Sequence, residues 1–320
     1  MQKDIQPKTF SDFIGQNRLI TTIKAMIDNA ERKNQSLDHL LFYGPPGLGK
    51  TTLANIIANQ LNAKVHQIQA GILEKKSDLI ALLTNVNEND IIFIDEIHSL
   101  NKTIEESLYS AMEYFTFNMT FGVDGNQKII KMKLKKFTLI GATTKIHSLS
   151  KPLKERFGLI SFFQQYSFDE ICKIITISAR KLSIEIDEEA IKLIAEFSRS
   201  TPRIANHLLK RCDDFSAKMN KNLISKEVVN KTFKFIELYQ HGLTREHLEY
   251  LNLLRENFNE KWVSLQTITA LLSTSKDQLI EDIESILLQE KYIEKSSKGR
   301  RITSLGINYL IKNFKLTNTV

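Results

Sequence analysis

The sequence has few of the residues that build disulfide-bonded or metal-stabilised proteins. Among its 320 residues only Cys172 and Cys212 are cysteines, and they lie far apart without a CxxC or Cys/His cluster. A disulfide framework or a zinc site is therefore not expected. We interpret both cysteines as small buried apolar side chains in a reducing compartment.

Long apolar runs are lacking as well. No stretch reaches the roughly 20 apolar residues that cross a bilayer, and the first residues, MQKDIQPKTF, lack the apolar core of a signal peptide. We therefore expect a cytoplasmic protein that has no membrane segment. The content of 42% hydrophobic and 25% charged residues is typical of a globular chain, and the length allows two or three domains.

Arginine is scarce relative to lysine, with 11 Arg and 33 Lys. The net charge of +7 permits binding to nucleic acid, although lysine-rich solvated faces would produce the same balance. Arginine carries a planar fork of donors that grips carboxylate or phosphate groups better than lysine does. The arginine of KPLKERFG, Arg156, is therefore a candidate for a specific partner.

Three regions with different patterns follow one another along the chain. In residues 1–166, short apolar runs at 39–43, 90–96 and 136–144 alternate with amphipathic stretches, which predicts an α/β domain with a parallel sheet. Residues 167–238 have a helical pattern throughout. Residues 239–320 predict short helices followed by two extended pieces around the basic turn of KYIEKSSKGRRIT.

A phosphate-binding loop is predicted between the first apolar run and the helical stretch TTLANIIANQL. The residues GPPGLGKT, from Gly44 to Thr51, fit the pattern GxxxxGK[ST]. Glycines allow successive N–H groups to point at phosphate oxygens, and the following helix adds its free N–H donors. Lys50 would contact the phosphates, and Thr51 would bind Mg²⁺ through its hydroxyl. The alternative is a strand-turn-helix connection that merely contains glycines.

An acidic pair ends the second apolar run, IIFIDEIH. Asp95 at a strand end could hold the water shell of Mg²⁺, and Glu96 could polarise the water that attacks the terminal phosphate. The pair could instead cap a helix, but the phosphate loop favours nucleotide hydrolysis. His98 is better explained as a polar residue at a helix start than as a further catalytic group.

Two further polar positions could contact a nucleotide. Thr143 and Thr144 end the third apolar run, where a hydroxyl could sense the phosphate, although threonines are common at strand ends. Arg203 follows Pro202 in the first turn of a predicted helix, where the helix dipole disfavours a positive charge. That cost indicates a ligand, such as the phosphates of a nucleotide.

The order of these parts resembles the AAA+ ATPases, and within that family the motors that move Holliday junctions. The similar segments run through nearly the whole chain: LDHLLFYGPPGLGKTTLANIIAN, DIIFIDEIHSLN, LIGATT, PLKERFG, EIDEEA and TPRIAN. The resemblance implies an AAA+ P-loop ATPase domain with a parallel sheet, a helical lid domain and a C-terminal winged-helix domain. It also implies a hexameric ring that hydrolyses ATP with Mg²⁺ and drives duplex DNA through four-way junctions in recombination and repair.

The family pattern assigns roles to individual residues. Arg156 matches an arginine finger that acts on the ATP of the neighbouring subunit, Thr143 matches the first sensor and Arg203 the second. Asp95 and Glu96 match the hydrolytic pair. Matches to nucleotide-binding positions are found at Ile5, Gly47, Gly49, Lys50, Thr51, Thr52, Glu113, Tyr114, Phe115 and Tyr166.

Two surfaces are implied to bind macromolecules. Residues 117–136 predict a hairpin around the turn VDGN, which in this family docks on a junction-binding partner protein. Without the resemblance, an ordinary surface hairpin is the simpler interpretation. In the C-terminal domain, Lys295, Lys298 and Arg300 would follow the DNA backbone, although a basic run can also be a solvated face. We interpret Trp262 as part of the core of that domain.

Several positions depart from the family pattern. Gln6 and Ser200 replace an arginine and a glycine, while Lys154 and Lys295 replace arginines, which keeps the charge but weakens a bidentate grip. None of these changes removes a group needed for hydrolysis. Two alternatives stay open. A clamp-loader subunit would end in a helical collar, and a nucleotide-gated binding module would not hydrolyse ATP, which the intact acidic pair disfavours.

Overall fold

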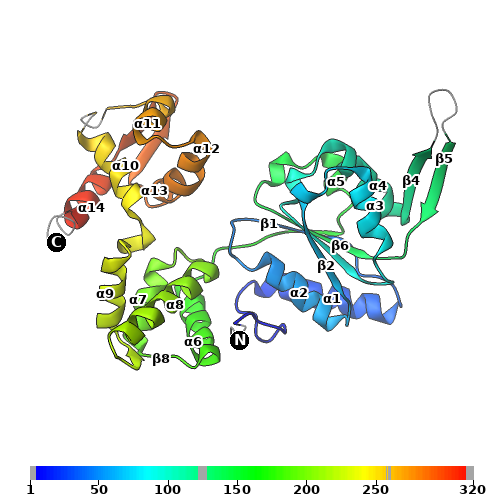
Figure 1. The fold of residues 1–320 in the computed structure, drawn as a ribbon, viewed down its shortest axis with the longest axis horizontal. Helices are drawn as coiled ribbons and strands as arrows, with labels where there is room; N and C mark the ends of the chain where they lie inside the picture. The colour runs from blue at the N-terminus through cyan, green and yellow to red at the C-terminus, as the bar shows by residue number, and fades with distance from the viewer. Residues whose placement is uncertain (1–4, 122–127, 257, 259–260, 315–320) are drawn as a thin grey trace. The chain divides into compact units, whose positions relative to one another are not determined.

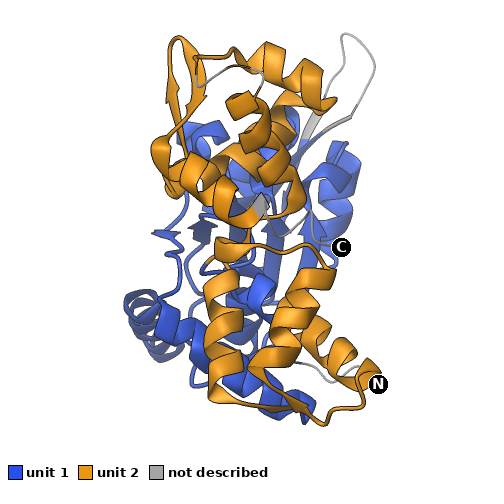
Figure 2. Cartoon of the chain, turned by 90° about the vertical axis from the view of Figure 1, so that its left-hand side faces the viewer, with its two compact units in different colours: residues 1–184, 200–207 blue, residues 185–199, 208–320 orange. Residues whose placement is uncertain are grey.

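The computed structural model describes residues 5–121, 128–256, 258 and 261–314. Its contacts divide the chain into two compact units, residues 1–184 with 200–207 and residues 185–199 with 208–320 (Figure 2). Within the described residues, no helix combines the length and the apolar character needed to span a membrane.

A five-stranded parallel sheet forms the centre of the first unit (Figure 1). Its spatial order is β2-β3-β6-β1-β7, and every neighbouring pair runs parallel. The strands are β1 (Leu40–Tyr43), β2 (Val65–Gln69), β3 (Ile91–Asp95), β6 (Thr138–Thr143) and β7 (Leu159–Phe162). The carboxyl ends of these strands therefore lie along one edge of the sheet, and their amino ends lie along the other.

Helices cover both faces of this sheet. On one face lie α1 (Asn17–Arg32) and α2 (Lys50–Gln60), and on the other lie α3 (Lys76–Thr84) and α4 (Lys102–Tyr114) (Figure 1). Strands covered on both faces have continuous apolar sequences because alternate side chains meet different helices. On the face of α3 and α4, one core contains Leu41, Ile92 and Leu139 from the strands and Leu79 and Leu108 from the helices.

The first unit also contains an antiparallel hairpin and two further helices. β4 (Thr116–Phe121) pairs with β5 (Lys128–Lys133), which confirms the predicted hairpin, while its predicted turn VDGN lies outside the described residues. The remaining elements are α5 (Lys151–Lys154), α6 (Phe168–Leu182) and the short 3₁₀ turns η1 (Ala70–Ile72), η2 (Ile97–Ser99) and η3 (Ile146–Ser148). A capping box formed by Ser167 and Glu170 starts α6, because each side chain accepts a hydrogen bond from the other's backbone N–H.

The second unit contains the predicted helical region from residue 185 onward, except residues 200–207, whereas α6 belongs to the first unit. α7 (Glu188–Phe197) packs against α9 (Lys226–Phe235), and α8 (Pro202–Lys218) runs from the first unit into the second. A short parallel pair, β8 (Glu185–Ile186) with β9 (Leu223–Ile224), joins the segments that precede α7 and α9. The side chain of Asp187 caps α7 by accepting from the N–H of Ala190.

The last region of the second unit has the order of a winged helix. After the 3₁₀ turn η4 (Gln240–Gly242) come α10 (Arg245–Glu256), α11 (Leu265–Leu272), α12 (Lys276–Gln278), the π-helical segment η5 (Leu279–Glu284) and α13 (Ser285–Gln289). An antiparallel pair, β10 (Ile293–Ser296) with β11 (Gly299–Ile302), forms the wing and is followed by α14 (Ser304–Phe314). Buried side chains such as Tyr250, Leu251 and Leu287 form a separate core for this region.

The three strands predicted from apolar runs are present as β1, β3 and β6. No apolar run predicted β2 or β7, which are the edge strands of the sheet. Exposed positions interrupt the half-buried residues of both strands. Their sequences, VHQIQ and LISF, therefore lack the continuous apolar character of a strand that is covered on both faces.

Candidate functional site

The predicted phosphate loop lies between the carboxyl end of β1 and the start of α2. Gly44, Gly47 and Gly49 have φ angles of 137°, 78° and 98°, in the region that residues with a side chain rarely adopt. α2 begins at Lys50, so the free N–H groups and the positive dipole end of the helix face the loop. Thr51 and Thr52 are half-buried in the first turn. This backbone geometry fits an anion site.

Lys50 reaches back over the loop. Its Nζ donates to the carbonyl oxygens of Gly44 and Pro45, both at 2.8 Å. Burial lowers the pKa of Lys50, while the nearby carboxylates of Glu96 and Asp95 oppose that shift. The structure thus brings the lysine of the loop and the acidic pair of β3 together.

Two aromatic rings brace the loop. Tyr166 is buried, and its hydroxyl donates to the carbonyl of Leu48 at 2.9 Å. Burial raises the pKa of Tyr166, so the phenol stays protonated and remains a donor. The ring of Phe13 lies against Gly49, where an added Cβ would come within 3.1 Å of the ring. Ile5 is half-buried at the start of the described chain.

The segment 201–203 also packs against the phosphate loop, at Gly47. The backbone N–H of Arg203 donates to the carbonyl of Gly47 at 3.4 Å. A Cβ added at Gly47 would lie 2.9 Å from Thr201 Cγ2 and 3.0 Å from Arg203 Cβ. The exposed side chain of Arg203 therefore starts beside the phosphate loop, where it can reach a bound phosphate.

The acidic pair stands at the carboxyl end of β3. Asp95 is the last residue of the strand, and its Oδ1 accepts from the N–H of Glu96 at 3.0 Å. Glu96 has φ 48° and ψ 46°, a left-handed conformation that costs a residue with a side chain on the order of 1 kcal/mol. Such strain concentrates at functional sites. Because 44% of its side chain is exposed, Glu96 is open to water.

A histidine joins this acidic pair to the threonine strand. Thr143 ends β6, the neighbour of β3, and is fully buried. His98 Nδ1 lies 2.9 Å from Thr143 Oγ1 and 3.1 Å from Glu96 Oε2. Thr144 donates to the same Glu96 oxygen through its hydroxyl at 3.2 Å. The sequence interpretation of His98 as a polar helix-start residue missed this contact, because only the pairing of β3 with β6 brings Thr143 to it.

Arg156 lies at the opposite edge of the sheet from the phosphate loop. It precedes the amino end of β7, whereas the loop and Glu96 follow the carboxyl ends of β1 and β3. The two edges are separated by β1, whose four residues span about 13 Å. Arg156 is therefore not placed to contact a nucleotide at the loop of its own chain.

The predicted nucleotide-binding segment Glu113, Tyr114 and Phe115 lies with Arg156. It ends α4, where Phe115 caps the helix in a left-handed conformation with φ 49°. Glu113 Oε2 is 3.0 Å from Arg156 Nη2. The structure thus separates this segment from the phosphate loop of the same chain and groups it with the predicted finger.

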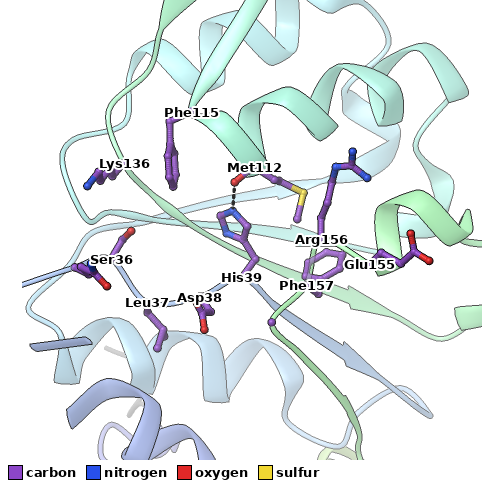
Figure 3. Close-up of a pocket in the computed structure, with 12 residues that line it drawn as sticks. Ser36, Leu37, Asp38, His39, Met112, Phe115, Lys136, Glu155, Arg156 and Phe157 are labelled. Atoms are coloured by element: carbon purple, nitrogen blue, oxygen red, sulfur yellow. Dashed lines mark hydrogen bonds between the residues drawn. The ribbon is translucent and has the colours of Figure 1, made fainter. Parts of the chain in front are cut away.

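A cavity of about 450 Å³ opens beside Arg156 (Figure 3). His39 lines it and is held on both sides of its ring, because Nε2 donates to the Met112 carbonyl at 3.0 Å and Nδ1 accepts from the Leu139 N–H at 2.8 Å. Burial lowers the pKa of His39, so the ring stays neutral. The carbonyl of His39 also accepts from the N–H of Gly158 at 2.9 Å. His39 therefore links α4, β6 and Gly158, two residues after Arg156, through hydrogen bonds.

The basic residues of the wing differ in their exposure to solvent. Lys295 and Lys298 are exposed, as a contact with DNA phosphates requires. Arg300 is only 7% exposed, and its Nε lies 2.7 Å from Oε1 of the buried Glu284. The hydroxyl of Tyr250 donates to the same Glu284 oxygen at 2.8 Å. The prediction that Arg300 contacts DNA is therefore corrected, because its guanidinium forms an ion pair inside the domain.

Trp262 also differs from its sequence interpretation as a core residue. It is half-buried, and the guanidinium of Arg301 lies 4.8 Å from the centre of its ring. Arg301 pairs with Glu294 across the wing at 2.8 Å. Trp262 thus supports the wing from outside the apolar core.

A magnesium site would be built around Thr51 and Asp95. Mg²⁺ prefers oxygen ligands, and in nucleotide sites it uses one or two carboxylates together with substrate phosphates and water. In the part of the chain that the structure describes, no cluster of three or more His, Cys, Asp or Glu residues could hold a metal by itself. One hydroxyl and one carboxylate beside the phosphate loop fit a metal that binds together with the nucleotide.

Three family models match successive parts of the chain. They describe the Holliday junction DNA helicase RuvB P-loop domain over residues 5–163, the RuvB AAA lid domain over 166–238 and the RuvB C-terminal winged helix domain over 240–311. The last match and the fold of that region exclude the helical collar that a clamp-loader subunit would carry.

Individual relatives agree with these models over nearly the whole chain. The Holliday junction branch migration complex subunit RuvB of Mycoplasmopsis synoviae (strain 53) is 52% identical over 307 residues, which cover 96% of this chain and 97% of the relative. The subunit of the same description from Campylobacter hominis is 42% identical, with 99% and 93% of the two chains covered. Among solved structures, the Thermotoga maritima RuvB Holliday junction branch migration motor is 36% identical with a TM-score of 0.83, covering 96% of this chain and 98% of that one.

Proposed function

This chain belongs to the RuvB family, and on that basis we propose that it forms a homo-hexameric ring that drives duplex DNA through Holliday junctions during recombination and repair. It is an AAA+ ATPase with a P-loop domain, a lid domain and a winged-helix domain, which we divide at residues 166 and 238. One observation carries the proposal: Lys50 and Glu96 lie at one edge of the sheet and Arg156 at the other. A complete hydrolytic site then needs two copies of the chain.

Within one subunit, the side chains at the carboxyl edge bind ATP and prepare the attacking water. Lys50 and the first turn of α2 hold the phosphates. Thr51 and Asp95 would hold Mg²⁺, which when bound neutralises charge on the phosphates. Glu96 orients the water and accepts its proton. Thr143 approaches the terminal phosphate from the sheet.

The lid and the N-terminal segment complete the nucleotide site. Arg203 contacts the phosphates from the lid, beside Gly47. Ile5 and Tyr166 border the base, and Tyr166 also braces the loop through its bond to Leu48 and its contact with Gly49. Closing such a site excludes water and strengthens the electrostatic contacts within it.

The neighbouring subunit supplies the final positive charge. Its Arg156 enters the site and stabilises the charge that develops as the terminal phosphoryl group is transferred. Its segment 113–115 arrives with the arginine, which accounts for a nucleotide contact by residues that lie far from the loop of their own chain. Hydrolysis in one subunit is thereby coupled to the position of the next.

Two surfaces connect the ring to the junction. Lys295 and Lys298 on the wing contact phosphates of duplex DNA without reading its sequence. The hairpin of β4 and β5, within residues 117–136, docks on a RuvA-type junction-binding protein. The protein acts in the cytoplasm, where the chromosome and the ATP pool are available.

Strand exchange on a synthetic four-way junction tests this function. The assay contains ATP, Mg²⁺ and a RuvA protein from a related organism, and Glu96→Gln serves as the matched control that binds ATP but does not hydrolyse it. We expect ATP-dependent exchange that the partner stimulates and that Glu96→Gln abolishes. ATP hydrolysis that is equal on linear duplex, without exchange and without a response to the partner, would contradict the proposal.

A further inference from the structure

His98 makes two contacts that the roles assigned so far do not use. Its Nδ1 lies 2.9 Å from the hydroxyl oxygen of Thr143 and 3.1 Å from Oε2 of Glu96. The side chain is 16% exposed, so the ring is held within the site rather than turned to solvent. One ring nitrogen is thus shared between the residue that senses the phosphate and the residue that activates water.

The hydrogen bonds at Thr143 determine where its own proton can point. A threonine hydroxyl has one donor and two acceptor positions. The N–H of Lys145 already donates to Thr143 Oγ1 at 2.9 Å. If His98 Nδ1 carries a proton and donates as well, both acceptor positions are filled. The hydroxyl proton is then the group of Thr143 that has no partner among the described residues, and a phosphate oxygen that reaches this buried side chain can accept it.

The two carboxylate oxygens of Glu96 differ in their hydrogen-bond partners. Oε2 is contacted by His98 Nδ1 and by the hydroxyl and N–H of Thr144, the latter two at 3.2 and 3.4 Å. Oε1 accepts no hydrogen bond from any residue that the structure describes. A carboxylate anchored through one oxygen presents the other in a fixed direction, and that free oxygen is available to accept a proton from water.

We infer that His98 is a positioning residue that couples Thr143 to Glu96, because its Nδ1 forms a hydrogen bond with the Thr143 hydroxyl and lies in contact with Oε2 of Glu96. It directs the hydroxyl proton of Thr143 toward the terminal phosphate and fixes the free oxygen of Glu96 toward the attacking water. Because the same ring nitrogen contacts both residues, movement of Thr143 on phosphate binding or release changes the position of His98 against Glu96. This inference deepens the proposed function and rests on it.

Substitutions that move the donor test the role of Nδ1. An Asn amide is attached at Cγ, as Nδ1 is, whereas the Gln amide lies one bond further out, close to the position of Nε2. We expect His98→Ala and His98→Gln to lower kcat for ATP hydrolysis by roughly 10- to 100-fold, as is typical when an orienting residue behind a reacting group is lost. His98→Asn should recover a large part of the rate. The affinity for a fluorescent ATP analogue should be unchanged in all three variants.

A second comparison separates coupling from general loss of structure. Thr143→Val removes the partner hydroxyl, and the double variant with His98→Ala should be no slower than the slower single variant, because both act on one unit. An undiminished kcat in His98→Ala, equal rates for the Asn and Gln variants, or multiplicative losses in the double variant would each overturn the inference. Should His98→Ala fail to fold, the comparison of Asn with Gln still decides.

The matched control is Glu96→Gln in the same assay. If Glu96→Gln hydrolyses ATP at the native rate, the proposed function itself fails. If Glu96→Gln is inactive while every His98 variant is fully active, the hydrolytic site stands and only the role of His98 is rejected.

Discussion

Arg156 and Glu113 of the same chain form an ion pair, with Arg156 Nη2 3.0 Å from Glu113 Oε2. Arg156 also donates through Nη1 to the Pro152 carbonyl at 2.6 Å, and its guanidinium lies 4.5 Å from the centre of the Tyr109 ring. Its Nε is buried and has no partner among the described residues. The two charged side chains are 25% and 41% exposed, and partly exposed ion pairs contribute no more than about 1 kcal/mol. The arginine is therefore held in place but can be drawn away by a phosphate.

Replacing Arg156 should abolish hydrolysis without abolishing nucleotide binding. Loss of an arginine finger lowers phosphoryl transfer by roughly 10³-fold or more, and Arg156→Ala should show a decrease of that order in the steady-state ATPase rate. Mixing it with Glu96→Gln should partly restore turnover, because an Arg156→Ala subunit keeps its own Glu96 and receives Arg156 from its neighbour. Lys154→Ala, two residues away on α5, is the matched control. Normal hydrolysis by Arg156→Ala in the assembled ring would reject the action in trans.

Glu113→Gln should release Arg156 from its intramolecular partner. Loss of an ion pair that contributes about 1 kcal/mol raises the population of unpaired Arg156 by about fivefold. The ATPase rate of the assembled ring should therefore rise by no more than about fivefold. At protein concentrations too low for assembly, the variant and the native chain should have the same ATPase rate. Glu155→Gln is the control, because Glu155 pairs with the exposed Lys151. A lower rate in the ring would show that Glu113 positions the arginine for reaction instead of restraining it.

The parts of the site that sequence could predict are those built from neighbouring residues. The phosphate loop is a continuous segment whose glycines and lysine act through their own backbone turn and the following helix, so its geometry follows from local chemistry. The same holds for β1, β3 and β6, whose burial on both faces is visible as apolar runs. The edge strands β2 and β7 carry exposed side chains and gave no such signal.

Residues whose role depends on distant partners were misjudged. His98 contacts Thr143, 45 positions later, and no residue near His98 in the sequence indicates that partner. Arg300 stands in a basic run that predicts a surface, but Glu284, 16 positions earlier, draws it into the interior. A single sequence shows charge and local pattern, whereas burial of a charged group is decided by a partner on another element.

The wing offers two different kinds of basic residue, and their substitutions should have different effects. Lys295→Ala and Lys298→Ala should each weaken duplex binding and reduce the slope of log affinity against log salt by about 0.9, the value for one lost phosphate contact. Fluorescence anisotropy over a salt series measures both quantities. Lys234→Ala on α9 is the control outside the winged-helix region. Unchanged slopes for both wing variants would show that these two lysines do not contact DNA phosphates.

Arg300→Ala should act on stability instead. It leaves the carboxylate of Glu284 buried without its cation, a loss that costs about 3–5 kcal/mol. We expect a lower unfolding temperature for the winged-helix region and a normal salt dependence of DNA binding by the fraction that remains folded. A reduced salt slope with an unchanged unfolding temperature would show that Arg300 contacts DNA after all.

His247 should make the winged-helix region sensitive to mild acid. Burial, together with the nearby Arg199, lowers the pKa of His247 to about 4. In the neutral ring Nδ1 accepts from the hydroxyl of Thr244 at 2.7 Å, and Nε2 donates to the Asp282 carbonyl at 3.2 Å. Nδ1 also accepts from the backbone N–H of Thr244 at 3.2 Å, and protonation of Nδ1 would remove this bond and place a charge in the interior. The folded state therefore binds a proton less readily than the unfolded chain, whose histidine has a pKa of about 6.5.

The free energy of unfolding should consequently fall as pH decreases from about 6.5 to about 4, with a total loss on the order of 3 kcal/mol. Urea unfolding followed by fluorescence measures this region selectively, because Trp262 is the single tryptophan of the chain and lies in it. His247→Gln cannot be protonated, so it should flatten the pH dependence even if it lowers stability at pH 7. His207→Gln, at an exposed position, should leave the slope unchanged. The same pH slope in His247→Gln as in the native chain would show that other groups control the acid sensitivity.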